Sequence, residues 1–228
     1  MKKLVALILT LILALGMLAA AQAEPSGDPI KIGLSGMTTG DFVESGLLMM
    51  DGVYLAAEEI NANGGLLGRP VEIVMVDNAS TAQGAVTSVN KILSEDVVAC
   101  IGPTTSGMVN STLQYFQEAG IPFVSAATSP AIRENESDCF FRISVSDALV
   151  GTVMVKFAAE TLNATKIGII HNTDDYGMAA MNAAVEAAKG YGIETYTEGM
   201  TSADTDVSAQ LLKIKSWGAD CVFSFTHD

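Results

Sequence analysis

The sequence predicts an α/β protein with two lobes, each built around a parallel β-sheet. Apolar segments of strand length alternate with helical segments along the whole chain after residue 28. That order is typical of parallel sheets with helices on both faces. The strand–helix order restarts near residues 142–147 without a low-complexity linker, which indicates a crossover from one sheet to a second.

The N-terminus is expected to be an export signal that is removed from the mature protein. Lys2 and Lys3 precede the apolar run 4–21, and Ala21-Gln22-Ala23 is a small-residue cleavage site. The run is long enough to be considered as a membrane anchor. Its basic start, small-residue end and polar continuation favour cleavage of residues 1–23 instead. The mature chain is therefore expected to work outside the cytoplasm and not to span a membrane.

Charge and composition exclude one class of partner. The net charge of the chain is −14, and no basic stripe is present. Binding to a nucleic acid backbone is therefore not expected.

The cysteines and histidines give no sign of a metal or a catalytic site. The odd number of cysteines leaves at least one thiol unpaired, and Cys100 and Cys221 lie in apolar strands where small buried hydrophobes are typical. The isolated His171 and His227 are interpreted as structural residues. No metal, cofactor or disulfide pairing is predicted.

The first lobe, residues 28–145, is expected to open with a strand at 30–36 and a helix from about 46 to 63. Gly64-Gly65 ends this helix, because glycine readily adopts the left-handed conformation of a helix C-cap.

A second strand at 71–77 leads into a helix at 81–93. The apolar face of that helix consists of Ala85, Val89, Ile92 and Leu93. A short strand at 140–144 closes the lobe.

Two strands lie between the helix at 81–93 and the strand at 140–144, and each of them ends in a hydroxyl-rich turn. The strand at 97–102 is followed by Thr104, Thr105 and Ser106, one of which should cap a helix at 107–119. The strand at 122–126 is followed by the turn Ala127-Thr128-Ser129, and Pro130 suits the first position of another helix. Free N–H groups at helix starts attract small anions. Two such turns on adjacent strands therefore predict a cradle for a carboxylate.

The second lobe, residues 146–228, repeats the strand–helix pattern. Helices are expected at 147–162, 177–191 and 205–217, and strands at 166–172, 194–200 and 220–225. Three strands are fewer than stable open sheets usually hold. We therefore expect the chain to be C-terminally truncated, so that both lobes are incomplete.

Two enzyme-like interpretations fail on spacing. Gly33, Gly36 and Gly40 do not have the spacing of the dinucleotide-binding fingerprint. The nucleophile motif G-x-S-x-G is absent, as is a plausible Ser/His/acid set, so the protein is not expected to be an enzyme.

Four segments resemble one family in the same order and at nearly the same spacing. They are EEINANGGLLGRPVEIVMVDNAS, IGPTTSG, GIPFVSAATSPAI and IGIIHNTDDYG. They are similar to the type I periplasmic binding proteins for branched-chain amino acids (leucine, isoleucine, valine), the substrate-binding receptors of ABC importers. The resemblance covers essentially the whole mature chain. It implies two Rossmann-like lobes that trap an amino acid between them and present it to a membrane permease.

The resemblance also implies site residues. Ser106 matches a serine that holds the α-carboxylate of the ligand. Ala126, Ala127 and Thr128 match a turn whose carbonyl and hydroxyl receive the α-ammonium group. Tyr176 matches a tyrosine that the second lobe presents across the cleft. The alternative for Ser106 is a helix cap, a role compatible with ligand binding because the backbone N–H groups stay free, and the alternative for the turn is an ordinary connection.

The sequence departs from the family in three places. The turn lacks a common proline, which leaves the register of Ala126 and Ala127 open by one residue. Ser45 stands where the family often has a tyrosine, with Phe42 nearby, so the identity of the bound amino acid stays open. The acidic partner of the ammonium group would lie beyond Asp228. The alternative function is a sensor domain of a receptor or regulator for amides or related small molecules.

Overall fold

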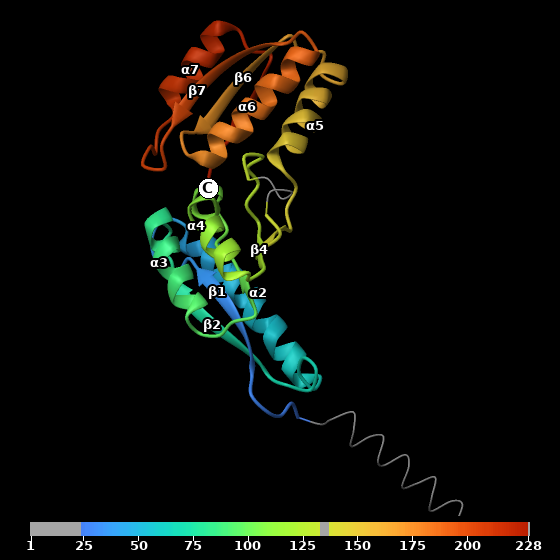
Figure 1. The fold of residues 1–228 in the computed structure, drawn as a ribbon. Coiled ribbons are helices and arrows are strands. Elements are labelled where there is room, and N and C mark those ends of the chain that lie inside the picture. Colours follow the sequence, from blue (N-terminus) through green and yellow to red (C-terminus); the bar gives the residue numbers. More distant parts are fainter. Residues whose placement is uncertain (1–23, 133–136, 228) are drawn as a thin grey trace, which may run out of the picture.

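The computed structural model describes residues 24–132 and 137–227, and it contains two parallel sheets in separate lobes (Figure 1). The strand order is β2-β1-β3-β4-β5 in the first sheet and β7-β6-β8 in the second, and all paired strands are parallel. The predicted signal, residues 1–23, lies outside the described residues. The predicted α/β fold with two parallel sheets is confirmed.

The element bounds follow the sequence pattern closely. The first lobe contains β1 (Ile30–Gly36), α2 (Val43–Ala62), β2 (Val71–Asp77), α3 (Ala82–Leu93), β3 (Ala99–Ile101), α4 (Ser106–Ala119), β4 (Phe123–Ser125) and β5 (Phe140–Arg142). The second lobe contains α5 (Asp147–Glu160), β6 (Lys166–Asn172), α6 (Asp175–Gly190), β7 (Glu194–Met200), α7 (Ser208–Trp217) and β8 (Cys221–Phe225). The expected boundary at residue 145 falls in the segment between β5 and α5.

The four longest strands, β1, β2, β6 and β7, match their predicted ranges residue for residue, whereas β3, β4 and β5 are shorter than predicted. Helix α2 begins three residues before its predicted start. Gly64 and Gly65 follow it with φ values of 93° and 75°, which confirms the left-handed ending.

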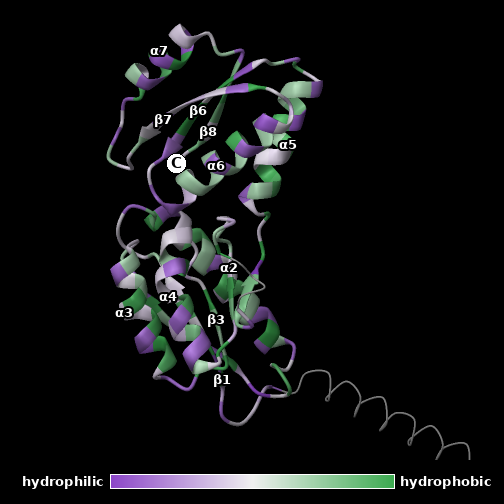
Figure 2. Ribbon diagram, turned by 45° about the horizontal axis from the view of Figure 1, so that its top comes forward, coloured by the Kyte–Doolittle hydropathy of each residue, from purple (hydrophilic) through white to green (hydrophobic). Residues whose placement is uncertain are grey.

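Each lobe has its own hydrophobic core. In the first, Phe116 of α4 stacks on Phe123 of β4 with ring centroids 4.1 Å apart. The predicted apolar face of α3 is confirmed, because Ala85, Val89 and Ile92 are fully buried. In the second, small buried alanines of α6 lie against the apolar strands β6 and β8. In Figure 2, β3 is coloured as hydrophobic, and α3 alternates between hydrophobic and hydrophilic residues.

One predicted helix is wrong. Pro130 lies in a turn, and the described residues 130–132 form no helix. The physical reason is that the Arg142 guanidinium donates to the carbonyls of Ser129 and Ile132, so these groups are held in a turn. Only the first of the two hydroxyl-rich turns therefore opens a helix.

The cysteines are free thiols. Cys100 is fully buried, as predicted, and burial raises the pKa of its thiol to about 12. Cys221 is only partly buried. Among the described residues, no helix is both long and apolar enough to cross a membrane.

Candidate ligand-binding cleft

A cleft of about 780 Å³ lies between the two lobes. Strands β1, β3 and β4 are neighbours in the first sheet, so the segments that follow their carboxyl ends form one wall. The facing wall comes from the segments that follow β6 and β8, which contribute Tyr176, Thr226 and His227. The lining residues are Met37, Asp41, Phe42, Glu44, Ser45, Leu47, Leu48, Asp51, Thr104, Thr105, Ser106, Ala126, Ala127, Thr128, Tyr176, Thr226 and His227. All five residues that the resemblance singled out are among them.

Helix α4 points its N-terminus into this cleft. Thr105 occupies the N-cap position, but its side chain makes no capping hydrogen bond. The Val109 N–H donates to the Thr105 carbonyl at 3.0 Å. The N–H groups of the first three helical residues, from Ser106 to Met108, precede this bond and have no acceptor within the helix. Together with the positive end of the helix dipole, they can receive an anion.

Ser106 begins this helix and joins the two turns of the first lobe. Its side chain is buried, and its hydroxyl accepts the Ser129 N–H at 3.2 Å. A hydroxyl that accepts one bond still has its own hydrogen to donate. A second link comes from Ser125, whose hydroxyl donates to the Pro103 carbonyl at 2.6 Å and accepts the Ala127 N–H. The first-lobe wall is therefore fixed before any ligand arrives.

Residues at the crossover between the lobes form hydrogen bonds to the carbonyls of the second hydroxyl-rich turn, residues 126–129. Arg142 donates to the Ala127 carbonyl, and the Ser144 hydroxyl donates to the Ala126 carbonyl at 2.8 Å. Ala127 is buried, and the protein already engages both its N–H and its carbonyl. Ala126 is exposed. Both carbonyls already accept one hydrogen bond, so it is the exposure of Ala126 that favours it as the residue that faces a ligand, since a carbonyl oxygen can accept a second bond.

Thr128 is backed by a buried carboxylate, Asp147, at the start of α5. The Asp147 N–H donates to the Thr128 carbonyl at 2.9 Å. Asp147 is 4% exposed, and its Oδ2 has no hydrogen-bond partner among the described residues. Burial raises the pKa of Asp147, although the Thr128 hydroxyl and the Arg142 charge oppose the shift. Asp147 thus lies behind Thr128 and is not among the residues that line the cleft.

The second lobe contributes Tyr176 from the first turn of α6. Asp174 caps this helix by accepting the Gly177 N–H at 2.9 Å. Gly177 permits a close approach, because a Cβ at this position would lie 2.1 Å from the Asn172 carbonyl oxygen. Tyr176 is partly buried and packs against the core of the second lobe. Its ring is thus held by the helix start rather than by a loop.

His227, interpreted from the sequence as structural, lines the cleft. Its ring lies 4.9 Å from that of Tyr176 and 4.9 Å from that of Phe42 of the first lobe, between centroids. The Nε2 atom of its ring is 2.6 Å from a carboxylate oxygen of Asp174. Its backbone N–H donates to the side-chain oxygen of Asn172. Burial acts to raise the pKa of Asp174, but the bonds from His227 and Gly177 outweigh burial and lower it. Phe42 and His227 join the lobes across the cleft.

The loop that carries Phe42 is tied to the end of β2. Burial acts to raise the pKa of Asp77, but the Thr39 hydroxyl and the N–H groups of Ala79 and Thr38 donate to its carboxylate and lower the pKa to about 2. The lobes also touch outside the cleft, where Asn110 of α4 donates to Asp175 of α6 at 2.9 Å.

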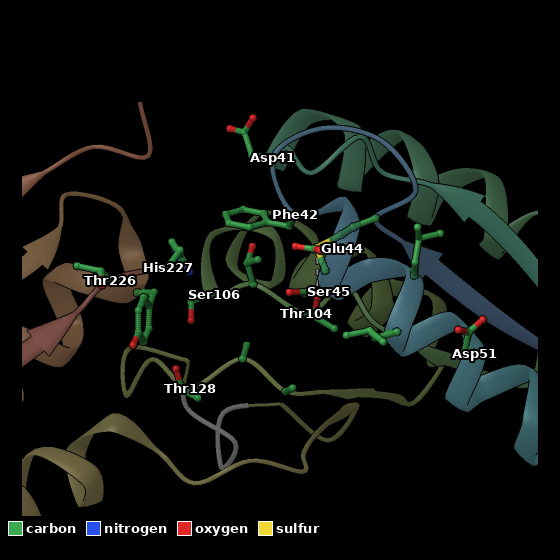
Figure 3. A pocket seen from close by; sticks show the side chains of 17 residues that line it. Asp41, Phe42, Glu44, Ser45, Asp51, Thr104, Ser106, Thr128, Thr226 and His227 are labelled. Atoms are coloured by element: carbon green, nitrogen blue, oxygen red, sulfur yellow. Dashed lines mark hydrogen bonds between the residues drawn. The ribbon is translucent and has the colours of Figure 1, made fainter. Parts of the chain in front are cut away.

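Figure 3 shows how the polar side chains are distributed. Ser106, Thr128, Thr226 and His227 gather toward one end of the cleft, and Asp51 lies at the other end. Glu44 and Ser45 lie between them.

The sequence pattern missed Asp147 and His227. The signal for Asp147 was an acid at a helix start in the crossover, and for His227 a histidine just after the carboxyl end of a strand.

Comparison with known proteins identifies one family. The family model described as "Periplasmic binding protein" matches residues 29–227. A leucine-, isoleucine-, valine-, threonine- and alanine-binding protein of Pseudomonas aeruginosa is 28% identical over 212 residues, which cover 92% of this chain and 57% of the relative. An amino acid binding protein of the same organism is 30% identical over 197 residues, covering 85% of this chain and 53% of the relative.

Solved structures agree with the fold. LivJ, the branched-chain amino acid transporter substrate-binding protein of Streptococcus pneumoniae solved with isoleucine, has a TM-score of 0.78 and 29% identity, covering 86% of this chain and 57% of LivJ. A fatty acid ABC transporter substrate-binding protein from Thermomonospora curvata has a TM-score of 0.79 and 22% identity, covering 90% and 53%. The latter shows similarity of fold alone. The chain spans a little over half the length of the relatives it matches.

Proposed function

Because the chain belongs to the periplasmic binding protein family, we propose that it is the extracytoplasmic solute receptor of an ABC importer and binds an amino acid between its lobes. One observation carries the proposal. The start of α4 and Thr128 lie on the same wall of the cleft, and Asp147 is buried behind Thr128, so donors for an anion stand beside acceptors for a cation. An α-amino acid presents those two charges on adjacent groups.

The carboxylate is assigned to the start of α4. The free N–H groups there, the helix dipole and the Ser106 hydroxyl can all donate to one or two carboxylate oxygens. No lysine or arginine is among the described residues that line the cleft. The carboxylate would therefore be bound by neutral donors, the N–H groups of α4 and the Ser106 hydroxyl. The hydrogen bond from the Ser129 N–H keeps that hydroxyl in place.

The ammonium group is assigned to Thr128 and to the carbonyl of Ala126, an exposed residue. Behind Thr128, the Asp147 carboxylate supplies negative charge within a desolvated part of the wall. A buried carboxylate without a full set of partners is costly in the empty protein. A cation bound in front of it would offset part of that cost, which links ligand binding to the stability of the crossover segment.

The second lobe would then cover the ligand. Tyr176 and His227 present aromatic rings with polar edges, a combination that suits contact with an aliphatic stem and exclusion of water. Phe42 meets His227 from the opposite lobe. We propose that this contact forms part of the closed state, and that the closed receptor delivers its ligand to a membrane permease. The binding role needs no catalytic step.

Isothermal titration calorimetry tests the proposal. The protein in its full natural length would be titrated with leucine, isoleucine, valine, alanine and other natural L-amino acids. Each bound amino acid would be compared with its methyl ester and its N-acetyl derivative, which remove one of the two charges. The proposal expects binding of at least one amino acid and a large loss for both derivatives. Equal binding of an N-acetyl derivative would contradict it.

A further inference from the structure

A hydrogen bond joins the two lobes directly, outside the cleft. The side-chain amide of Asn110, on α4 of the first lobe, donates to the carboxylate of Asp175, on α6 of the second lobe, at 2.9 Å. Both residues are exposed, and neither is among the residues that line the cleft. The bond therefore belongs to the boundary between the lobes and not to the site that would hold an amino acid.

The N-terminal ends of two helices meet at this bond. Asp175 is the first residue of α6, and a Cβ at Gly107, the second residue of α4, would lie 3.8 Å from the Asp175 carboxylate. In each helix the adjacent residue lines the cleft, Ser106 before Gly107 and Tyr176 after Asp175. The contact between α4 and α6 therefore fixes how far apart the lobes hold Ser106 and Tyr176.

The charge of Asp175 favours the arrangement in which the lobes touch. The N-terminal end of a helix carries a partial positive charge, so two such ends repel each other, and a carboxylate between them offsets the repulsion. When the lobes separate, Asp175 stays on α6 but loses both the Asn110 amide and the nearby end of α4. The interaction is thus specific to the closed arrangement, which is the condition for shifting an equilibrium between two conformations.

The packing between the lobes allows them to separate. Each cluster of buried apolar residues in the described part of the chain lies within a single lobe, so opening exposes no core. Asn110 and Asp175 border a hollow of about 640 Å³ that is lined from both lobes, so the surfaces around their bond are not closely packed. With no shared core to hold the lobes together, one hydrogen bond has a measurable weight in the equilibrium between open and closed forms.

We propose that Asn110 and Asp175 form a latch that stabilises the closed receptor and thereby sets its affinity for an amino acid. The inference rests on the proposed function and adds a conformational control to it. Both are positioning residues, because they act on the distance between the two walls of the cleft. Since the latch raises the fraction of closed protein, an amino acid that prefers the closed form binds more tightly and leaves more slowly.

Substitutions of opposite sign at residue 110 test the latch in the protein of full natural length. Calorimetry measures the dissociation constant for L-leucine and for each other L-amino acid that binds the parent. Asn110→Asp places two carboxylates opposite each other, so this constant should rise about twofold to fivefold. Asn110→Lys places an ammonium group there, so it should fall about twofold. The exchanged pair Asn110→Asp/Asp175→Asn restores the hydrogen bond with donor and acceptor reversed, and it should recover most of the affinity that Asn110→Asp loses.

Gln114→Ala is the matched control. The Gln114 amide also donates to an exposed carboxylate, that of Glu118 at 2.6 Å, but this bond stays within α4. Its loss should leave the affinity unchanged.

Small-angle X-ray scattering on the empty protein gives a second measurement that needs no amino acid. Asn110→Lys should have a smaller radius of gyration than Asn110→Asp, because the first favours closed lobes and the second favours open ones. Equal affinities and equal radii in these two variants would overturn the latch and leave the receptor function standing. Failure of every amino acid to bind would instead overturn the proposed function, and the scattering comparison would still decide whether the lobes latch.

Discussion

Replacing Ser106 by alanine should have two separable effects, one on the empty protein and one on ligand binding. In the empty protein, the Ser106 hydroxyl accepts the N–H of Ser129, and both residues are buried. Alanine removes the acceptor and leaves that N–H without a partner. A buried donor without a partner costs about 1–3 kcal/mol, so the free energy of unfolding should fall by about that amount.

The second effect is the loss of a hydrogen bond to the ligand carboxylate. A hydrogen bond to a charged group contributes about 1.5–3 kcal/mol, so the dissociation constant for the bound amino acid should rise roughly tenfold to a hundredfold. Chemical denaturation measures the first effect and isothermal titration calorimetry the second. They are measured on the same purified variant, at a temperature where it is fully folded.

Ser111→Ala provides the control on the same helix. The Ser111 hydroxyl donates to the Met108 carbonyl at 2.8 Å, and the residue does not line the cleft. This variant should bind the ligand like the parent. The reasoning would be refuted if Ser106→Ala lost stability but kept full affinity, because Ser106 would then brace the turn without touching a carboxylate.

Three further variants test other parts of the account. Asp147→Asn should stabilise the empty protein slightly, by about 1 kcal/mol or less, because it removes a buried charge, yet weaken amino-acid binding by about 1–3 kcal/mol; thermal unfolding and calorimetry measure the two, and unchanged affinity would remove Asp147 from the site. The lowered pKa of Asp77 contributes stability that is present above about pH 4 and lost as the pH falls toward 2; Asp77→Asn should therefore cost about 1–2 kcal/mol at pH 7 and almost nothing near pH 2 in urea titrations, and a cost independent of pH would show that the carboxylate charge is not responsible. Gly177→Ala should lower both stability and affinity, because the added Cβ would lie 2.1 Å from the Asn172 carbonyl oxygen and must shift the helix start that carries Tyr176; a crystal structure with that helix start unmoved would contradict this.

The sequence pattern was sufficient where a local rule decides the structure. Mostly apolar runs indicated β2 and β6, and β6 is buried along nearly its whole length, so it needs no alternation of apolar and polar residues. Apolar residues three or four positions apart form one face of α3, and this spacing correctly predicted that Val89 and Ile92 lie in the core. The resemblance brought together Ser106, Thr128 and Tyr176, which the structure places around one cleft.

Long-range partners explain what the sequence pattern could not predict. Pro130 has the local features of a helix start, but the Arg142 guanidinium from a later strand takes up the neighbouring carbonyls. Asp147 resembles an ordinary acid at a helix start, and its burial depends on the turn that holds Thr128. His227 gains its role from Phe42, which is remote in the chain. The spacing of residues within a short segment cannot reveal these partners, because they come from distant parts of the chain.

A crystal structure of the full-length protein with its bound amino acid tests the central claim most directly. We expect the ligand carboxylate within hydrogen-bond distance of the Ser106 hydroxyl and the first N–H groups of α4. We expect the ammonium group at Thr128, on the side where Asp147 is buried. A ligand bound in the reverse orientation, or bound outside the cleft between the lobes, would contradict the account.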